Sequence, residues 1–148
     1  MKERRKSYNR KNFVIALILL AAANVILGSV MLIQSRAAMR TQIDRRMLDI
    51  SNTAAYMLNG DEMKALTADD RGGEEYEDAL EILRNFQQNI ALAYIYAINC
   101  EDDGSFTFSV DPTLDDPGDF GEPIVTTEAL RTAANGTPAV DKKPYEDA

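Results

Sequence analysis

Residues 94–111, YIYAINCEDDGSFTFSVD, contain the pattern on which the predicted fold depends. The segment Tyr94–Asn99 is rich in the aromatic and β-branched residues that favour strands. The letters CEDDG follow, and they place Asp and Gly where a tight turn needs positive φ. Large apolar residues then alternate with small polar ones: Phe106, Phe108 and Val110 with Ser105, Thr107 and Ser109. The stretch therefore predicts a β-hairpin whose second strand has one buried face.

Helical patterns precede the hairpin. From Glu74 to Ala91 apolar residues recur at helical spacing, and the first turn is acidic, as the positive end of a helix dipole favours. Asp61 could cap a shorter turn that ends at Leu66. Helices followed by antiparallel strands are typical of an α+β domain, with the helices on one face of the sheet.

The chain after the hairpin supplies too few strands for a complete sheet. Asp111–Pro123 has no periodicity, and its carboxylates lack the spacing of a calcium-binding loop. Thr126–Ala134 predicts a short helix that ends at Gly136, and a third strand is expected near Ala139–Asp141. A lone hairpin does not form a stable sheet. Either a partner completes the domain or the chain is cut short, and we favour the second interpretation.

One segment is apolar enough to cross a membrane. Phe13–Ile33 contains no charged residue, and as a helix it would span roughly 31 Å, close to the thickness of a bilayer core. A cleaved signal peptide has a shorter apolar core, so an uncleaved anchor is favoured. Asn24, beside Ala21–Ala23 and Gly28, could join two such helices through a hydrogen bond, or it is a tolerated polar residue.

The charge of the chain is distributed unevenly around this segment. Residues 1–12 hold six basic residues and one acidic residue, whereas the chain from Ser35 onward holds ten basic and twenty-three acidic residues. The basic end is expected in the cytoplasm and residues 35–148 outside the membrane. The acidic excess argues against a nucleic-acid partner. The absence of His and the single Cys100 leave no usual zinc site, no imidazole catalysis and no intrachain disulfide.

A heptad pattern follows the apolar segment. Spacings of four, three, four and three separate its members, which are Ile43, Met47, Ile50, Ala54 and Met57. Residues 34–60 are therefore expected to form a stalk helix that continues from the membrane and stops at Asn59-Gly60, with Gly60 as a left-handed cap. The pattern fits a dimerising stalk, or a helix packed on its own domain's sheet, or both.

Several segments between residues 47 and 147 resemble one family. They are MLDISNTAAYML, LTADD, YEDALEILRNFQ, YIYAI, FTFSVDPTLDDPGDFGEP, TEALRTAANGTPAVD and PYEDA. Together they resemble the Cache-type, PAS-like extracytoplasmic sensor domains of bacterial membrane signalling proteins, most of all those that precede diguanylate cyclase domains. The chain lacks the tryptophan-glycine pair and further strands that would follow in such relatives, and also any cyclase, kinase or chemoreceptor output motif. The resemblance implies an N-terminal fragment of a sensor.

The resemblance also implies a ligand site on the concave face of the sheet. The residues that match it are Tyr94 and Tyr96, from one side of the first strand, with Asp111 and Tyr145. Aromatic walls with a carboxylate would suit an amine-bearing or polar small metabolite. The alternative is that both tyrosines are ordinary half-buried strand residues and that Asp111 caps its own loop.

These observations predict four segments: a cytoplasmic tail (1–12), a transmembrane helix (13–33), a stalk (34–60) and an incomplete sensor domain (61–148). We expect a membrane-anchored, homodimeric ligand sensor of a bacterial signalling protein, with neither catalytic residues nor a cofactor or metal of its own. The full-length parent would be a diguanylate cyclase. The alternatives are a chemoreceptor, a sensor histidine kinase, or a small anchored protein without a sensory role.

Overall fold

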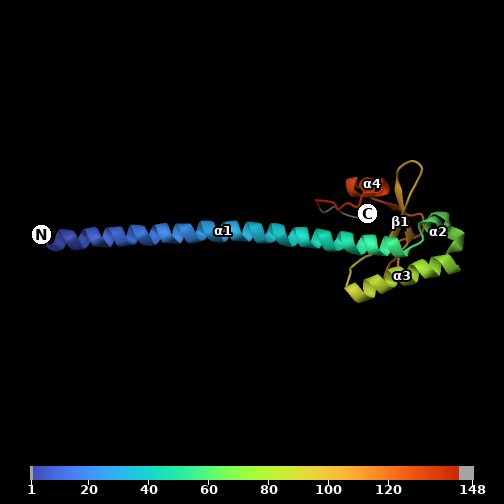
Figure 1. Cartoon of the computed structure of the whole chain (residues 1–148), viewed down its shortest axis with the longest axis horizontal. Helices are drawn as coiled ribbons and strands as arrows, with labels where there is room; N and C mark the ends of the chain where they lie inside the picture. Colours follow the sequence, from blue (N-terminus) through green and yellow to red (C-terminus); the bar gives the residue numbers. More distant parts are fainter. Residues whose placement is uncertain (1, 144–148) are drawn as a thin grey trace. The chain divides into compact units, whose positions relative to one another are not determined.

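The computed structural model describes residues 2–143 (Figure 1). The chain divides into two compact units, Met1–Ile43 and Asp44–Ala148. The described elements in chain order are α1 (Lys2–Met57), α2 (Gly60–Ala65), a 3₁₀ turn η1 (Ala68–Asp70), α3 (Glu74–Ile90), β1 (Ala97–Cys100), β2 (Phe106–Val110), β3 (Pro123–Ile124) and α4 (Glu128–Ala134). The second unit is thus α+β, as the sequence predicts.

Helix α1 includes the whole predicted membrane segment. It contains no proline and a single glycine, Gly28, so no residue interrupts its hydrogen-bond ladder. It is the one described helix that is long and apolar enough to cross a bilayer. Its polar residues in the apolar part bond to their own helix: Asn24 Nδ2 donates to the Leu20 carbonyl at 2.8 Å, and Ser29 Oγ donates to Val25. The prediction that the helix continues beyond residue 33 is confirmed.

The end of α1 differs from the prediction. The helix ends at Met57, and Asn59 adopts an extended conformation that caps the next helix, α2. Asn59 Oδ1 accepts hydrogen bonds from the backbone N–H groups of Asp61 and Glu62. Gly60 is therefore the first residue of α2 rather than a left-handed cap, and Asp61 is not the capping residue. Both predictions were wrong because the side chain of Asn59 caps the N-terminus of α2.

Helix α3 confirms the amphipathic pattern. It begins at Glu74, and it buries Tyr76, Ala79 and Leu83 on one face. Ala91 ends it in the left-handed conformation, with φ of 53°. These side chains form the core of the second unit together with Ala54 of α1, Leu66 and Val110. Burial of this apolar surface is the main term that holds the helices against the sheet.

The hairpin is confirmed, with one change of register. Strands β1 and β2 pair antiparallel, and Gly104 takes a φ of 80° in the turn. Ala97 pairs with Val110 but Ile98 pairs with Phe108, so Ser109 is an extra residue in a bulge. Val110 is fully buried, whereas Phe108 is only half-buried. The bulge breaks the simple alternation from which one continuous buried face was predicted.

The third strand lies elsewhere than predicted. Residues 139–141 are not a strand, and β3 (Pro123–Ile124) pairs with β2 instead, giving the order β1-β2-β3. The Phe108 N–H donates to the Glu122 carbonyl, and the Gly121 N–H donates to the Phe108 carbonyl. The loop after β2 thus returns to the same strand that it leaves. Only long-range pairing determines this choice of partner.

Helix α4 follows β3 and agrees with the prediction. Thr127 Oγ1 accepts a hydrogen bond from the Leu130 N–H, which caps the first turn. Gly136 ends the helix with a φ of 83°. The hairpin turn lies beside α4, since a β-carbon added at Gly104 would be 3.8 Å from Arg131 Nη1.

Candidate functional site

Three of the four predicted ligand residues line one cavity of the second unit, called here the tyrosine cavity. Its volume is about 470 Å³. Its walls carry three aromatic rings, Tyr94, Tyr96 and Phe108, and three carboxylates, Asp111, Asp116 and Glu122. The fourth predicted residue, Tyr145, lies outside the described residues.

The two tyrosines do not belong to a strand, contrary to the prediction. Strand β1 begins at Ala97, so Tyr94 and Tyr96 lie in the connection between α3 and β1. Gln87 Nε2 of α3 donates to the Ala93 carbonyl and holds this connection to the helix. The segment pairs with no strand in the described chain because the ladder on β2 stops at Val110. Tyr94 remains 67% exposed at the rim of the cavity.

Aromatic packing forms one wall. The ring centroids of Tyr96 and Phe108 are 4.9 Å apart at an interplanar angle of 62°, an edge-to-face arrangement. Gly118 lies directly against the Phe108 ring, since a β-carbon at this position would be 2.7 Å from it. The glycine therefore lets the loop after β2 approach the sheet closely. Phe108 and Gly118 are site residues that sequence reasoning missed, although the glycine in an acidic loop was a usable signal.

Asp111 holds the loop that closes the cavity. One carboxylate oxygen, Oδ1, accepts hydrogen bonds from the N–H and the hydroxyl of Thr113, at 2.9 and 2.6 Å. The other, Oδ2, accepts from the Gly118 N–H at 2.9 Å. This geometry matches the alternative in which Asp111 caps its own loop. Oδ1 already accepts two hydrogen bonds, whereas Oδ2 accepts one and retains a lone pair for a ligand donor.

Two further carboxylates face the same cavity. Glu122 Oε2 accepts a hydrogen bond from the Asp119 N–H at 3.0 Å and so braces the turn before β3. Asp116 is exposed and has a φ of 110°, a strained backbone conformation for a residue other than glycine. Strained residues of this kind concentrate at functional sites. In the sequence both belong to the acidic loop that lacks the spacing of a calcium site, and neither was predicted to line the ligand site.

The electrostatic character of the tyrosine cavity is acidic. No Lys or Arg is among its lining residues, all of which the structure describes. The cavity therefore favours a cation, and rings at its wall can add a cation–π attraction. Two carboxyl groups elsewhere have a lowered pKa, Asp70 through its hydrogen bonds with Thr67 and Asp103 through those with Ser105. Both lie in turns, outside the cavity.

The predicted stalk residues separate into two groups. Ile50 and Ala54 are 9% and 4% exposed, whereas Ile43, Met47 and Met57 are 61%, 40% and 54% exposed. Ala54 belongs to the domain's own core. The helix therefore packs on its own domain through part of the heptad, and the remaining members are open to a partner. Within residues 2–143 no cluster of three acidic or cysteine side chains could hold a metal ion.

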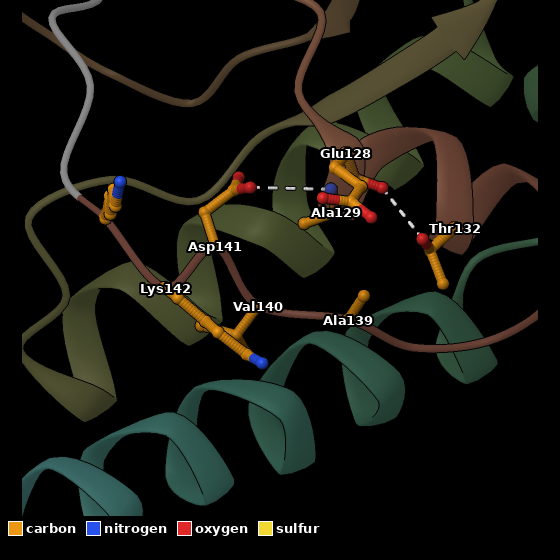
Figure 2. A pocket seen from close by; sticks show the side chains of 8 residues that line it. Glu128, Ala129, Thr132, Ala139, Val140, Asp141 and Lys142 are labelled. Carbon is orange, nitrogen blue, oxygen red and sulfur yellow. Dashed lines mark hydrogen bonds between the residues drawn. The ribbon is translucent and has the colours of Figure 1, made fainter.

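Another cavity, of about 530 Å³, lies between α4 and residues 139–143 (Figure 2). Asp141 Oδ1 accepts a hydrogen bond from the Ala129 N–H at 3.4 Å, and Thr132 Oγ1 donates to the Glu128 carbonyl. Asp141 thus satisfies one of the free donors in the first turn of α4. This cavity has no aromatic wall, and we assign to Asp141 a structural role.

Comparison of the chain with family models, with curated proteins and with solved structures finds no match.

Proposed function

We propose that this chain is the membrane-anchored, ligand-sensing part of a bacterial signalling protein, with residues 35–148 outside the membrane. The observation that carries the proposal is the convergence of Tyr94, Tyr96 and Asp111 on one cavity. Two further features support it. One is an apolar helix long enough for a bilayer. The other is that six basic residues precede its apolar segment, against four, Arg36, Arg40, Arg45 and Arg46, in the stretch that follows it. The resemblance to Cache-type sensor domains supplies the class of function.

The ligand class follows from the walls of the tyrosine cavity. Aromatic rings beside carboxylates bind ammonium groups through charge pairing and cation–π contact, the latter contributing about 0.5–2 kcal/mol. We therefore propose a small amine as the ligand. The exposed Asp116 carboxylate is the group best placed for the charge pair, because Asp111 and Glu122 already hold backbone N–H groups.

A route from this cavity to α1 exists within the second unit. Tyr96 also lines a smaller cavity of about 280 Å³, whose other walls include Ala54 and Leu58. A ligand that moves the Tyr96 ring would change the packing against this part of α1. A typical coupling of about 1–3 kcal/mol between two arrangements would produce a five- to hundredfold response. In the proposal, a homodimer of α1 helices transmits that change through the membrane.

The chain's own role in this proposal is binding and transmission, without catalysis. A diguanylate cyclase is our first choice for the output, and a chemoreceptor or sensor histidine kinase is the alternative. The lining residues of the tyrosine cavity include no His, and the hydroxyl of Thr113 is bonded to Asp111 within the same loop.

Titration of the full chain in detergent micelles with primary amines and with their N-acetylated counterparts tests the binding proposal. We expect the amines, but not the neutral amides, to shift the backbone amide resonances of Thr113 and Gly118, because acetylation removes the charge. Tyr96→Leu should abolish the shift. Tyr56→Leu is the matched control, since Tyr56 is 91% exposed on α1 and outside the cavity. An unchanged spectrum with every amine would refute the proposal.

A further inference from the structure

The loop after β2 contains both Asp–Pro peptide bonds of the chain, Asp111–Pro112 and Asp116–Pro117. A peptide bond between these two residue types is unusually sensitive to mild acid, for two chemical reasons. The side-chain carboxyl group of aspartate can form a five-membered ring with the carbonyl carbon of its own main chain. The proline nitrogen carries an additional alkyl group in place of a hydrogen, so it is more basic than other peptide nitrogens and leaves more readily.

The backbone of Asp116 is strained at this bond. Its φ is 110°, a value that residues with a side chain rarely adopt. A residue before proline is restricted further, to extended conformations with φ of about −120°. Asp116 therefore violates two restrictions at once, and the second of them comes from the ring of Pro117. Cleavage of the bond removes that ring from Asp116, so part of the strain is released as the bond breaks.

The carboxyl group of Asp116 is also available for reaction. Its side chain is exposed, and among the described residues it forms no hydrogen bond or ion pair. Nothing in the described chain therefore holds the carboxyl group away from its own carbonyl carbon. Aspartate carboxyl groups serve as nucleophiles in covalent catalysis, so the reaction needs no unusual chemistry.

The side chain of Asp111 is held in place, in contrast. Oδ1 accepts hydrogen bonds from the N–H and the hydroxyl of Thr113, and Oδ2 accepts one from the Gly118 N–H. Asp111 is half-buried, and its φ is not positive. Attack on its own carbonyl carbon would break these hydrogen bonds without releasing strain. The bond Asp111–Pro112 is thus an internal control for Asp116–Pro117.

We propose that Asp116–Pro117 is a self-cleavage site of the folded chain. The protonated carboxyl group of Asp116 attacks the carbonyl carbon of the same residue. The bond from this carbon to the Pro117 nitrogen breaks, and the nitrogen takes the proton that the carboxyl group loses. Asp116 is left as a cyclic anhydride, which one water molecule opens to two carboxyl groups. The net reaction is hydrolysis of one peptide bond.

Cleavage would open the loop without detaching it. Asp116 and Pro117 both line the tyrosine cavity, so the cut lies in its wall. Beyond the cut, the Gly118 N–H donates to Asp111, and the Gly121 N–H donates to the Phe108 carbonyl. The two fragments are therefore expected to stay associated through the sheet. The proposal does not depend on the amine site, because the reaction uses only the chain and water.

Incubation of the full chain in detergent micelles at about pH 5, followed by intact-mass spectrometry, measures cleavage at both bonds. Proteins are commonly most stable between about pH 5 and 8, and circular dichroism verifies that the helices persist. Fragments 1–116 and 117–148 should accumulate at least about tenfold faster than 1–111 and 112–148, because release of ordinary backbone strain accounts for a factor of this size. In urea at the same pH the two rates should become about equal, because unfolding removes both the strain and the hydrogen bonds of Asp111.

Three variants identify the reacting groups. Asp116→Glu should slow the cleavage at least about tenfold, because the longer side chain forms a six-membered ring less readily. Pro117→Ala should slow it as well, because an ordinary peptide nitrogen leaves poorly. Asp115→Glu is the matched control: Asp115 is the preceding residue and is also exposed, so the rate should not change.

Equal cleavage of the two Asp–Pro bonds in the folded chain would overturn the proposal, as would the absence of fragments 1–116 and 117–148. A rate at Asp116–Pro117 that urea does not lower would contradict the role of strain. Unchanged cleavage in Asp116→Glu, or its suppression by protease inhibitors, would show that this carboxyl group is not the nucleophile and would also overturn the proposal.

Discussion

Asp111 shows how one side chain can organise the loop that forms a site. Its two carboxylate oxygens hold Thr113 and Gly118, which lie two and seven residues after it along the loop. That arrangement brings Gly118 against the ring of Phe108 and fixes the distance between the loop and the sheet. The shape of the tyrosine cavity thus depends on a cap and a missing β-carbon. Both are residue-scale features.

Gly118→Ala should destabilise the second unit by about 1–3 kcal/mol, because the new methyl group would overlap the Phe108 ring and force the loop or the ring to move. Urea unfolding of the full chain in micelles, followed by far-UV circular dichroism, measures the change. Gly60→Ala is the control. A β-carbon there meets nothing within 4 Å and φ is not positive, so the control should be neutral or slightly stabilising. Equal stability of the two variants would contradict the predicted overlap.

The hairpin turn should become less stable in acid. Hydrogen bonds from Ser105, from its side chain first and then its backbone N–H, lower the pKa of Asp103 in the folded state. The folded pKa thus lies below the unfolded one, so this contribution is present above about pH 3.9 and is lost as pH falls through the folded pKa. Asp103→Asn should flatten the dependence of stability on pH between about pH 5 and 2. Asp102→Asn is the control, and an unchanged slope in Asp103→Asn would contradict the assignment.

At the scale of elements, α1 has two kinds of surface in its last turns. Ala54 lies in the domain core beside Val110 of β2, so this part of the helix is fixed by its own domain. Met47 and Met57 are exposed on the same element. A coiled-coil seam would need all five heptad positions free. A dimer through α1 is therefore expected to use Ile43 and Met47, because Ile50 and Ala54 are buried within the domain itself.

Cysteine crosslinking tests this division of α1. In a Cys100→Ser background, Met47→Cys should form a disulfide-linked dimer in membranes, because its side chain is exposed. Asn52→Cys, also exposed, lies on the face of the helix opposite the heptad positions, so it should crosslink much less. Non-reducing gel electrophoresis measures the dimer fraction. The absence of dimer at both Ile43→Cys and Met47→Cys would remove the stalk dimer from the proposal.

At the scale of the whole molecule, the acidic second unit and the basic first residues are separated by an apolar helix. The positive-inside rule then places the basic segment in the cytoplasm. This orientation is a prediction from charge, and the single cysteine of the chain provides a direct test of it. Cys100 lies in β1 and is exposed.

A membrane-impermeant maleimide applied to intact cells should label Cys100, because the proposed orientation places it outside. In a Cys100→Ser background, Ser7→Cys should be labelled only after the cells are lysed. A maleimide that carries a mass tag retards labelled protein on a gel, and this shift measures labelling of Cys100 and of Ser7→Cys. The reverse pattern would invert the topology, and the sensor proposal would fail with it.

The local elements were predictable because their causes lie within a few residues. The apolar run of α1, the spacing of apolar residues in α3 and the acidic turn with Gly104 each act over one or two turns of chain. The capping of α4 by a threonine belongs to the same class, although the sequence left Thr126 and Thr127 as alternatives and the structure shows Thr127. Sequence reasoning failed locally at Asn59. Asn59 and Asp61 are both residue types that cap helices, and the structure shows that Asn59 caps α2.

The tertiary structure decided the rest, since those features depend on contacts distant along the chain. Pairing on β2 made Pro123–Ile124 the third strand and started β1 at Ala97, so Tyr96 lies just before that strand. Ala54, a member of the heptad pattern, is buried in the core of the second unit. The loop after β2 places Asp116 and Glu122 in the same cavity as Tyr94 and Tyr96. The sequence by itself determined the helices, the hairpin and the uneven charge, because these follow from local periodicity and composition. Tertiary structure alone determined the tyrosine cavity, because its walls come from segments that only folding brings together.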